Sequence, residues 1–351
     1  MNLPFKIEDI TADWLSQALS TRTPGTRVTD VQITRVIPGT TTKILLRASY
    51  ADGVKADGPP QALCVKGGFD DALRPLVGDA YIAEANFFNY VAPQLNAPLP
   101  RCWYAGADVQ RLQGIVILDD LSAVGVTFGE PTRAWTPDQV AAGLELQARW
   151  HAQTWGETPE RFPWLHVGSW VRNPAKQLLG EGNWNRAFSD SALVQKIPTA
   201  LQNRERVENA FQTMWRDDDA FGIPCLNHCD PHIGNTYFNV DGKPGFLDWQ
   251  SASLAPAMDD VSYFLAGALT PEDRRAHERQ LLGHYVDALG SHLGSKVDFD
   301  AMWLDYRRHL MHGFIWSVVP ADMQQPENSA AMIERYVAAI EDLDTLVALK
   351  C

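Results

Sequence analysis

Three side chains that can supply oxygen ligands follow one another in the segment from Leu226 to Gln250. Asp230 comes five residues before Asn235, and Asp248 follows thirteen residues after that amide. Carboxylate and amide oxygens are the ligands with which proteins hold Mg²⁺ against nucleotide phosphates. We therefore expect Asn235 and Asp248 to bind the metal, which leaves Asp230 to accept a proton.

The residues between Asn235 and Asp248 predict a β-hairpin. The stretch 236–240 alternates aromatic and β-branched residues, Asp241-Gly242 is a favoured pair for a tight turn, and 245–247 has the character of a return strand. A hairpin folds the chain back on itself, so Asp248 is expected to lie beside Asn235. An H-x-D motif or a D-G turn alone is common, whereas packing needs by themselves rarely produce the whole combination.

The two motifs resemble those of the aminoglycoside-phosphotransferase-like small-molecule kinases, which include choline-kinase and ecdysteroid-kinase relatives. In that family the motifs have the forms H-G-D-x-H-x-x-N and [IL]-D-[WF]-[EQ]. Here they read His228-Cys229-Asp230, with Asn235 five residues on, and Leu247–Gln250. Cys229 is the one departure, because the family has glycine there. If that position needs a positive φ, a cysteine is strained by about 1 kcal/mol, and its thiol could make the site sensitive to oxidation.

The resemblance implies an α+β, protein-kinase-like bilobal fold, with a small antiparallel N-terminal lobe in residues 1–118 and a mostly helical C-terminal lobe in 119–351. It also implies a phosphotransferase that uses ATP, or GTP, with Mg²⁺ to phosphorylate a hydroxyl group of a small molecule. Asp230 would then be the catalytic base. Two alternatives stay open: an inactive protein that binds nucleotide or metabolite, and another nucleotide-dependent transferase on the same fold.

A buried-looking strand at 62–68 carries one lysine, Lys66. Lysine is rarely buried unless it is paired. Kinases place a lysine at this point to bind the α- and β-phosphates, and a glutamate of the next helix orients it. By the same resemblance, Glu84 in the helical stretch 79–90 is the expected partner.

Two further stretches are expected to contact the nucleotide. A hairpin over 28–50 has its turn at Pro38-Gly39, where backbone N–H groups and hydroxyl groups can bind phosphates. The residues that supply these groups are Gly39, Thr40, Thr41 and Thr42. The strand 114–121 resembles the family's hinge, which implies that backbone groups near Leu118 and Asp119 bind the adenine edge.

Composition excludes several classes of function. The 351 residues carry a net charge of −13, which argues against nucleic acid or an anionic membrane as partner. The N-terminal residues do not form a signal peptide and no apolar run is long enough to span a membrane, so we expect a cytoplasmic protein. Five cysteines without metal spacing are expected to be reduced thiols. The oligomeric state and the identity of the hydroxylated acceptor are not predicted.

Four residues outside the main motifs have a structural interpretation or none. His151, at the end of the helix predicted over 136–155, is expected to be a packed core histidine. By resemblance, Asp260 caps a helix and supports the catalytic loop. No partner can be assigned to His309 or His312 from the sequence.

Overall fold

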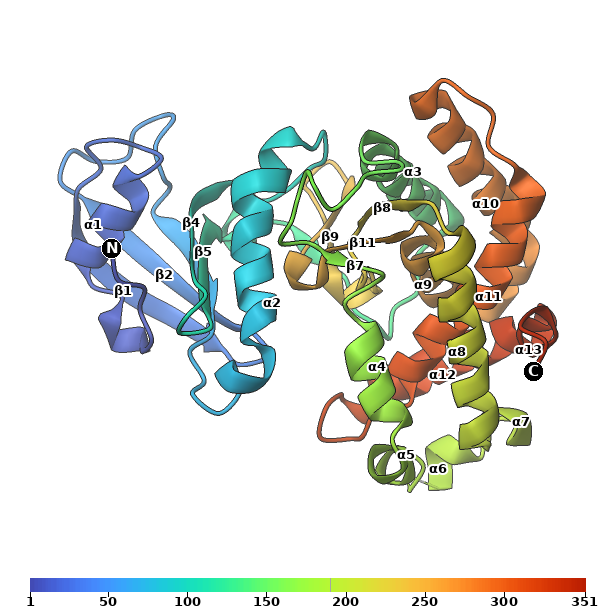
Figure 1. The fold of residues 1–351 in the computed structure, drawn as a ribbon. Helices are drawn as coiled ribbons and strands as arrows, with labels where there is room; N and C mark the ends of the chain where they lie inside the picture. The colour runs from blue at the N-terminus through green and yellow to red at the C-terminus, as the bar shows by residue number, and fades with distance from the viewer. Residues whose placement is uncertain (190) are drawn as a thin grey trace. The chain divides into compact units, whose positions relative to one another are not determined.

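The computed structural model describes residues 1–189 and 191–351 (Figure 1). These residues form two compact units. The N-terminal unit consists of Met1–Thr127 together with Leu247–Ser251, and the C-terminal unit consists of Phe128–Phe246 and Ala252–Cys351. The division expected between 118 and 119 falls inside strand β5 (Gln113–Asp119), so the N-terminal unit extends beyond it.

A five-stranded antiparallel sheet in the order β1-β2-β3-β5-β4 forms the centre of the N-terminal unit. Its other strands are β1 (Val28–Ile37), β2 (Thr42–Tyr50), β3 (Ala62–Gly67) and β4 (Cys102–Asp108). The helical segments of this unit are η1 (Ile7–Asp9), α1 (Ala12–Ser20), α2 (Arg74–Asn86), η2 (Phe87–Val91), η3 (Ala92–Gln94), η4 (Leu121–Val124) and η6 (Trp249–Ser251). The short strand β6 (Thr127–Phe128) lies where the N-terminal unit ends.

Alternation along β3 gives the two faces of this sheet different roles. Leu63 and Val65 are fully buried and pack in one hydrophobic cluster with Leu15 of α1. Lys66 points to the opposite face because successive side chains of a strand alternate. Helix α2 covers that face, and Figure 1 shows α1 and α2 on opposite sides of the sheet. The alternation therefore directs the lysine toward α2.

Helices make up most of the C-terminal unit. They are α3 (Pro137–Gln153), α4 (Arg172–Leu179), α5 (Glu181–Ala187), α6 (Ser191–Val194), α7 (Thr199–Gln202), α8 (Arg204–Phe221), α9 (Met258–Ala268), α10 (Pro271–Leu293), α11 (Phe299–Ser317), α12 (Pro326–Asp342) and α13 (Thr345–Ala348). A small sheet orders β7 (His166–Val167), β11 (Ser253–Pro256) and β8 (Pro224–Asn227), with β11 in the middle. The expected α+β class is confirmed.

Helix α3 illustrates how local sequence sets these boundaries. Thr136 caps its N-terminus by accepting a hydrogen bond from the Gln139 N–H, and Gln139 Oε1 accepts one from the Thr136 N–H. This reciprocal capping box satisfies two backbone donors that a helix start otherwise leaves unpaired. The helix buries Val140, Leu144 and Trp150, so capping and apolar spacing together define it.

The hairpin predicted between Asn235 and Asp248 forms from β9 (Thr236–Phe238) and β10 (Pro244–Phe246), which pair antiparallel. Its connection is longer than the expected two-residue turn. The Gly242 N–H bonds to Asn239 O at 2.9 Å, and Gly242 has a φ of 74°. A loop that ends with a left-handed glycine is the usual three-residue hairpin connection.

No helix among the described residues is long and apolar enough to cross a membrane.

Candidate active site

The Lys66 ammonium group lies between two carboxylates of the N-terminal unit. Lys66 Nζ is 2.7 Å from Glu84 Oε1 and 2.6 Å from Asp248 Oδ1, and all three side chains are at most 11% exposed. β3 supplies the lysine and α2 the glutamate, whereas Asp248 comes directly before η6. The structure thus brings together Lys66 with its expected partner and with one of the two predicted metal ligands.

Electrostatics keep Lys66 charged. Burial by itself would lower the pKa of Lys66, but the Asp248 and Glu84 carboxylates outweigh burial and raise it. Burial raises the pKa of Glu84, and the Lys66 charge opposes that shift. Lys66 therefore stays positively charged in its buried position, which is the property that a phosphate-binding group needs.

A second lysine near Asp248 was not predicted. Lys43 Nζ lies 3.5 Å from Asp248 Oδ2, and the Lys43 side chain is 40% exposed. Lys43 is the direct cross-strand partner of Lys66 in the β2–β3 pair, so the two side chains share a face of the sheet. That register is the signal from which Lys43 could have been found.

The segment after Asp248 is fixed inside the N-terminal unit. Trp249 is fully buried and stacks on Phe87, with ring centroids 4.3 Å apart. The Thr41 hydroxyl donates a hydrogen bond to the Gln250 side chain. Asp248 itself has a φ of 68°, a left-handed conformation that is uncommon for a non-glycine residue and is often found at functional sites.

The predicted phosphate loop has exposed and buried members. Gly39 and Thr40 are exposed, and the Tyr81 hydroxyl donates to Thr40 O at 2.7 Å. Thr41 and Thr42 are buried. Because the Thr41 hydroxyl donates to Gln250, phosphate binding here would rest on backbone N–H groups and on the other hydroxyl groups of the turn. Binding by these residues stays a prediction.

The predicted hinge lies at the end of β5. Leu118 is buried and pairs with Cys64 of β3, and the Asp119 N–H donates to Arg101 O at 3.1 Å. The Asp119 carboxylate accepts from Trp103 Nε1 at 2.7 Å. The Asp119 N–H is thus already used within the sheet, and the adenine contact at Leu118 and Asp119 stays a prediction.

Asp230 and Asn235 lie together in the C-terminal unit. Asn235 Nδ2 donates to Asp230 O at 2.9 Å and to Asp230 Oδ2 at 3.0 Å. Both bonds use the amide nitrogen, whereas a metal ion would be bound by the amide oxygen, so the donor set fits Mg²⁺. That Asn235 shares an ion with Asp248 rests on sequence spacing and stays a prediction. The Asp230 side chain is 29% exposed, and its Oδ1 lies 3.8 Å from His232 Nε2.

Asp260 supports the loop before Asp230 as expected. Its Oδ2 accepts from the His228 N–H at 2.8 Å and its Oδ1 accepts from the Cys229 N–H at 2.7 Å. His151 is fully buried beside it, with Nε2 3.3 Å from Asp260 Oδ2, which confirms His151 as a core histidine. The expected capping role is wrong, because α9 begins at Met258 and Asp260 is already inside the helix.

Cys229 adopts the left-handed conformation that glycine usually takes. Its φ is 64°, so the expected strain of about 1 kcal/mol is present. The side chain is fully buried among Val171 and Ala255. Burial, with a smaller contribution from the Asp260 charge, raises the pKa of the thiol well above its ordinary value. Oxidation requires an accessible thiolate, so the buried thiol argues against the expected oxidation sensitivity.

A profile of the ecdysteroid kinase-like family matches residues 76–296, which is more than half of the chain. The chain belongs to the ecdysteroid kinase-like family. A curated relative is an uncharacterized kinase-like protein of Caenorhabditis elegans, 25% identical over 224 residues that make up 60% of this chain and 57% of the relative. This chain thus matches little more than half the length of that relative.

Solved structures show the same fold at low sequence identity. Choline kinase LicA from Streptococcus pneumoniae is 16% identical with a TM-score of 0.51, and the match covers 95% of this chain and 98% of LicA. An ethanolamine kinase of Plasmodium vivax is 10% identical with a TM-score of 0.56, covering 90% and 83%. APH(2")-IIia in its GDP and kanamycin complex is 14% identical with a TM-score of 0.51, covering 95% and 98%. The protein-kinase-like fold of this family member is confirmed.

Proposed function

We propose that this ecdysteroid kinase-like protein transfers the γ-phosphoryl group of ATP to a hydroxyl group of a small molecule. The buried Lys66 ammonium between Glu84 and Asp248 is the observation that carries the proposal. Phosphoryl transfer asks a protein mainly for positioned charge. A lysine fixed by a helix glutamate meets that demand, and packing alone would not require it.

Each residue has a distinct role in the proposed reaction. Lys66 binds the nucleotide phosphates, and Asn235 and Asp248 are the ligands that would hold Mg²⁺. When bound, Mg²⁺ neutralises the negative charge that the phosphates carry. The Asp230 carboxylate orients the acceptor hydroxyl and takes its proton while the hydroxyl oxygen bonds to the γ-phosphorus and ADP leaves. Asp230 is partly exposed, so an acceptor can reach it.

The residues near the loop that carries Asp230 favour an acceptor with apolar surface. Trp170 and Trp316 are partly buried and pack on the cluster that contains Cys229, next to Asp230 in the chain. Partly exposed indole rings bind apolar or cationic groups better than strongly hydrated sugars. We therefore infer a fairly apolar, hydroxylated acceptor. The names of the structural relatives, choline kinase and ethanolamine kinase, make amino alcohols the first alternative.

The test is transfer of labelled phosphate. Purified protein is incubated with Mg²⁺ and γ-labelled ATP, or GTP, and with a panel of sterols, aliphatic alcohols, choline, ethanolamine, sugars and aminoglycosides. Asp230→Asn preserves the size of the side chain and removes the base, so transfer is expected to fall by about 10³-fold or more. Asp241→Asn, in the exposed β9–β10 loop, is the matched control and should retain full transfer.

Other results would identify the alternatives. A nucleotide-dependent rise in melting temperature without any phosphorylated product would indicate a binding protein. Consumption of nucleotide with a product other than a phosphorylated small molecule would indicate another transferase. Transfer that persists in Asp230→Asn would contradict the role of Asp230.

A further inference from the structure

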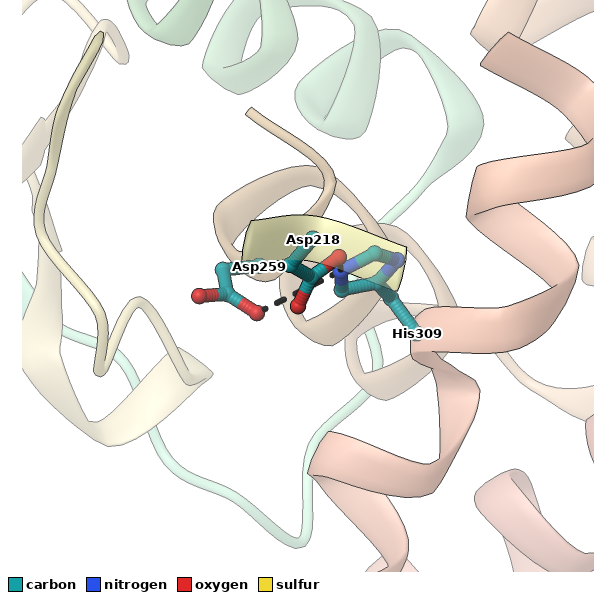
Figure 2. A group of neighbouring side chains, drawn as sticks. All are labelled: Asp218, Asp259 and His309. Carbon is teal, nitrogen blue, oxygen red and sulfur yellow. Dashed lines mark ion pairs between the residues drawn. The ribbon is translucent and has the colours of Figure 1, made fainter. Parts of the chain in front are cut away.

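Two carboxylates and a histidine lie together in the helical part of the C-terminal unit. His309 Nε2 of α11 is 3.1 Å from Asp218 Oδ1 of α8 and 3.6 Å from Asp259 Oδ1 of α9. The side chains of His309, Asp218 and Asp259 are 2%, 7% and 3% exposed. Figure 2 shows the His309 ring directed at both carboxylates. We term these three residues the helix junction, because they come from three helices that are far apart in the sequence.

The hydrogen bond of the other ring nitrogen decides what His309 presents to the carboxylates. His309 Nδ1 donates to Asp305 O at 2.8 Å, one turn earlier in α11. In a neutral ring Nε2 therefore carries the lone pair, and this lone pair faces two carboxylates. A lone pair and negative charges repel one another, so a cation is needed between them. The cation is either a proton on Nε2 or a metal ion.

A proton on Nε2 finds no well-placed acceptor. Asp218 Oδ1 is near enough, but His309 Nε2 makes no hydrogen bond within the described part of the chain, so this oxygen lies off the N–H direction. The second oxygen of Asp259 also has no hydrogen-bond partner there. Buried polar atoms are seldom left unpaired. Two such atoms in one buried cluster therefore indicate a bound ligand.

The distances in the helix junction suit an ion that is bound by all three residues. Zn²⁺ binds nitrogen and oxygen at about 2.0–2.2 Å in a tetrahedron, which places two ligand atoms about 3.3–3.6 Å apart. The observed separations from His309 Nε2, 3.1 and 3.6 Å, lie close to this range. All three ligand atoms lie within 4.8 Å of one another, so rotation of a carboxylate can bring them around one ion. The fourth position is left for a water molecule or for the second oxygen of Asp259.

The charges around the helix junction favour a divalent ion over a proton. Arg172 Nη2 lies 3.3 Å from Asp218 Oδ2, but Arg172 Nη1 lies nearer, at 2.6 Å, to Asp219 Oδ1. The charge of Arg172 is thus shared with a further carboxylate. Asp218 and Asp259 bring two negative charges into a buried place, where uncompensated charge is costly. A proton supplies one positive charge, whereas a divalent ion supplies two.

The neighbours of the helix junction are those that usually support a bound metal ion. A metal-binding histidine commonly donates its other ring N–H to a carbonyl oxygen, as His309 does to Asp305 O. Metal-binding carboxylates are also held by a further partner, and Arg172 has this position at Asp218. An imidazole nitrogen together with carboxylate oxygens suits Zn²⁺ better than Mg²⁺, which prefers oxygen ligands.

We propose that the helix junction is a structural zinc site, in which His309 Nε2, Asp218 Oδ1 and Asp259 Oδ1 bind one Zn²⁺ and link α8, α9 and α11. Asp259 directly precedes Asp260, which accepts hydrogen bonds from the loop before Asp230. The ion would therefore also fix the part of α9 that supports this loop. Nucleotide and acceptor take no part in the site, so its existence does not depend on the proposed function.

Metal content is the first test. Protein purified without a histidine tag or a chelator should contain one Zn²⁺ per chain, measured by elemental mass spectrometry. His309→Gln and Asp259→Asn should each lose it. His292→Gln and Asp287→Asn, at exposed positions of α10, are the matched controls and should retain it. Asp248→Asn, in the proposed magnesium site, should also retain it, which separates the two sites.

The wild-type protein alone gives a second test, which holds even if a variant fails to fold. After a chelator has removed the metal, the protein should bind one equivalent of Co²⁺ and show the intense visible absorption of tetrahedral cobalt. Addition of Zn²⁺ should abolish this absorption and raise the melting temperature by about 5 °C or more. Mg²⁺ should have neither effect.

Three results would overturn the proposal. Wild-type protein that binds no zinc, as purified or on titration, would make His309 a protonated bridge between the carboxylates. Zinc that remains in His309→Gln or Asp259→Asn, when circular dichroism shows the variant to be folded, would be an adventitious ion only. Cobalt that binds without the tetrahedral absorption would contradict the ligand geometry.

Discussion

Lys66 Nζ lies 2.6 Å from Asp248 Oδ1, although 182 residues separate the two in the sequence. This contact joins the middle strand of the N-terminal sheet to the segment that follows the β9–β10 hairpin. It explains why Leu247–Ser251 belongs to the N-terminal unit while the hairpin before it belongs to the other. A buried ion pair is costly unless both partners are present, so the contact has measurable consequences.

Replacement of Lys66 by methionine should destabilise the protein and abolish nucleotide binding. The buried Glu84 carboxylate would lose its cation, and Asp248 would keep only the half-exposed Lys43, at a cost of about 3 kcal/mol. Urea unfolding measures the loss, and the melting-temperature shift with ATP measures binding. Burial and like charge raise the pKa of the remaining carboxylates, so the loss should be smaller at pH 5 than at pH 8.

Lys43→Met is the graded control for this experiment. Lys43 is 40% exposed and lies 3.5 Å from Asp248, so its removal should cost less than about 1 kcal/mol. Equal losses for the two lysine variants would contradict a special role for Lys66.

Asp248→Asn and Asp230→Asn should affect the proposed reaction in different ways. Loss of the Asp248 carboxylate removes a metal ligand, so the Mg²⁺ concentration for half-maximal transfer should rise about tenfold or more. Loss of the Asp230 carboxylate removes the base, so kcat should fall at unchanged Mg²⁺ dependence. Mg²⁺ titrations of both variants distinguish the roles. The same Mg²⁺ dependence in Asp248→Asn and wild type would exclude Asp248 as a ligand.

Asp260→Asn should destabilise the protein more than a substitution on the surface does, because Asp260 holds the loop before Asp230. One of the backbone N–H groups of His228 and Cys229 would face an amide nitrogen in place of a carboxylate oxygen, which costs about 2–3 kcal/mol for a buried pair. Asp287→Asn, at an exposed position of α10, is the matched control and should be neutral. Thermal unfolding compares the two, and similar melting temperatures would show that the loop does not depend on Asp260.

The cysteines should react in an order set by burial. Cys225 and Cys229 are fully buried, and burial raises the pKa of both thiols. Cys351 is partly exposed at the end of the chain. Iodoacetamide at pH 8 should therefore modify Cys351 first, and Cys225 and Cys229 only after unfolding in urea. Peptide mass spectrometry gives the order. Early modification of Cys229 would restore the hypothesis of an oxidation-sensitive site.

Local sequence was sufficient for several parts of this protein. The capping residues of α3, the apolar run of β3 and the β9–β10 hairpin are short-range patterns, so their elements could be predicted. The pairing of Lys66 with Glu84 followed from the resemblance to a kinase family, which supplies long-range information that one strand does not contain.

Only the tertiary structure decided the remaining relationships. Lys43 faces Asp248 because the β2–β3 register places it beside Lys66, and register depends on how the whole sheet pairs. His309 meets Asp218 and Asp259 because three helices pack together, and helix packing follows surface shape along their whole length. The sequence thus determined which side chains could carry charge, whereas packing determined which of those charges lie close together. The reason is that electrostatic energies depend on burial and distance, and neither is a property of a single segment.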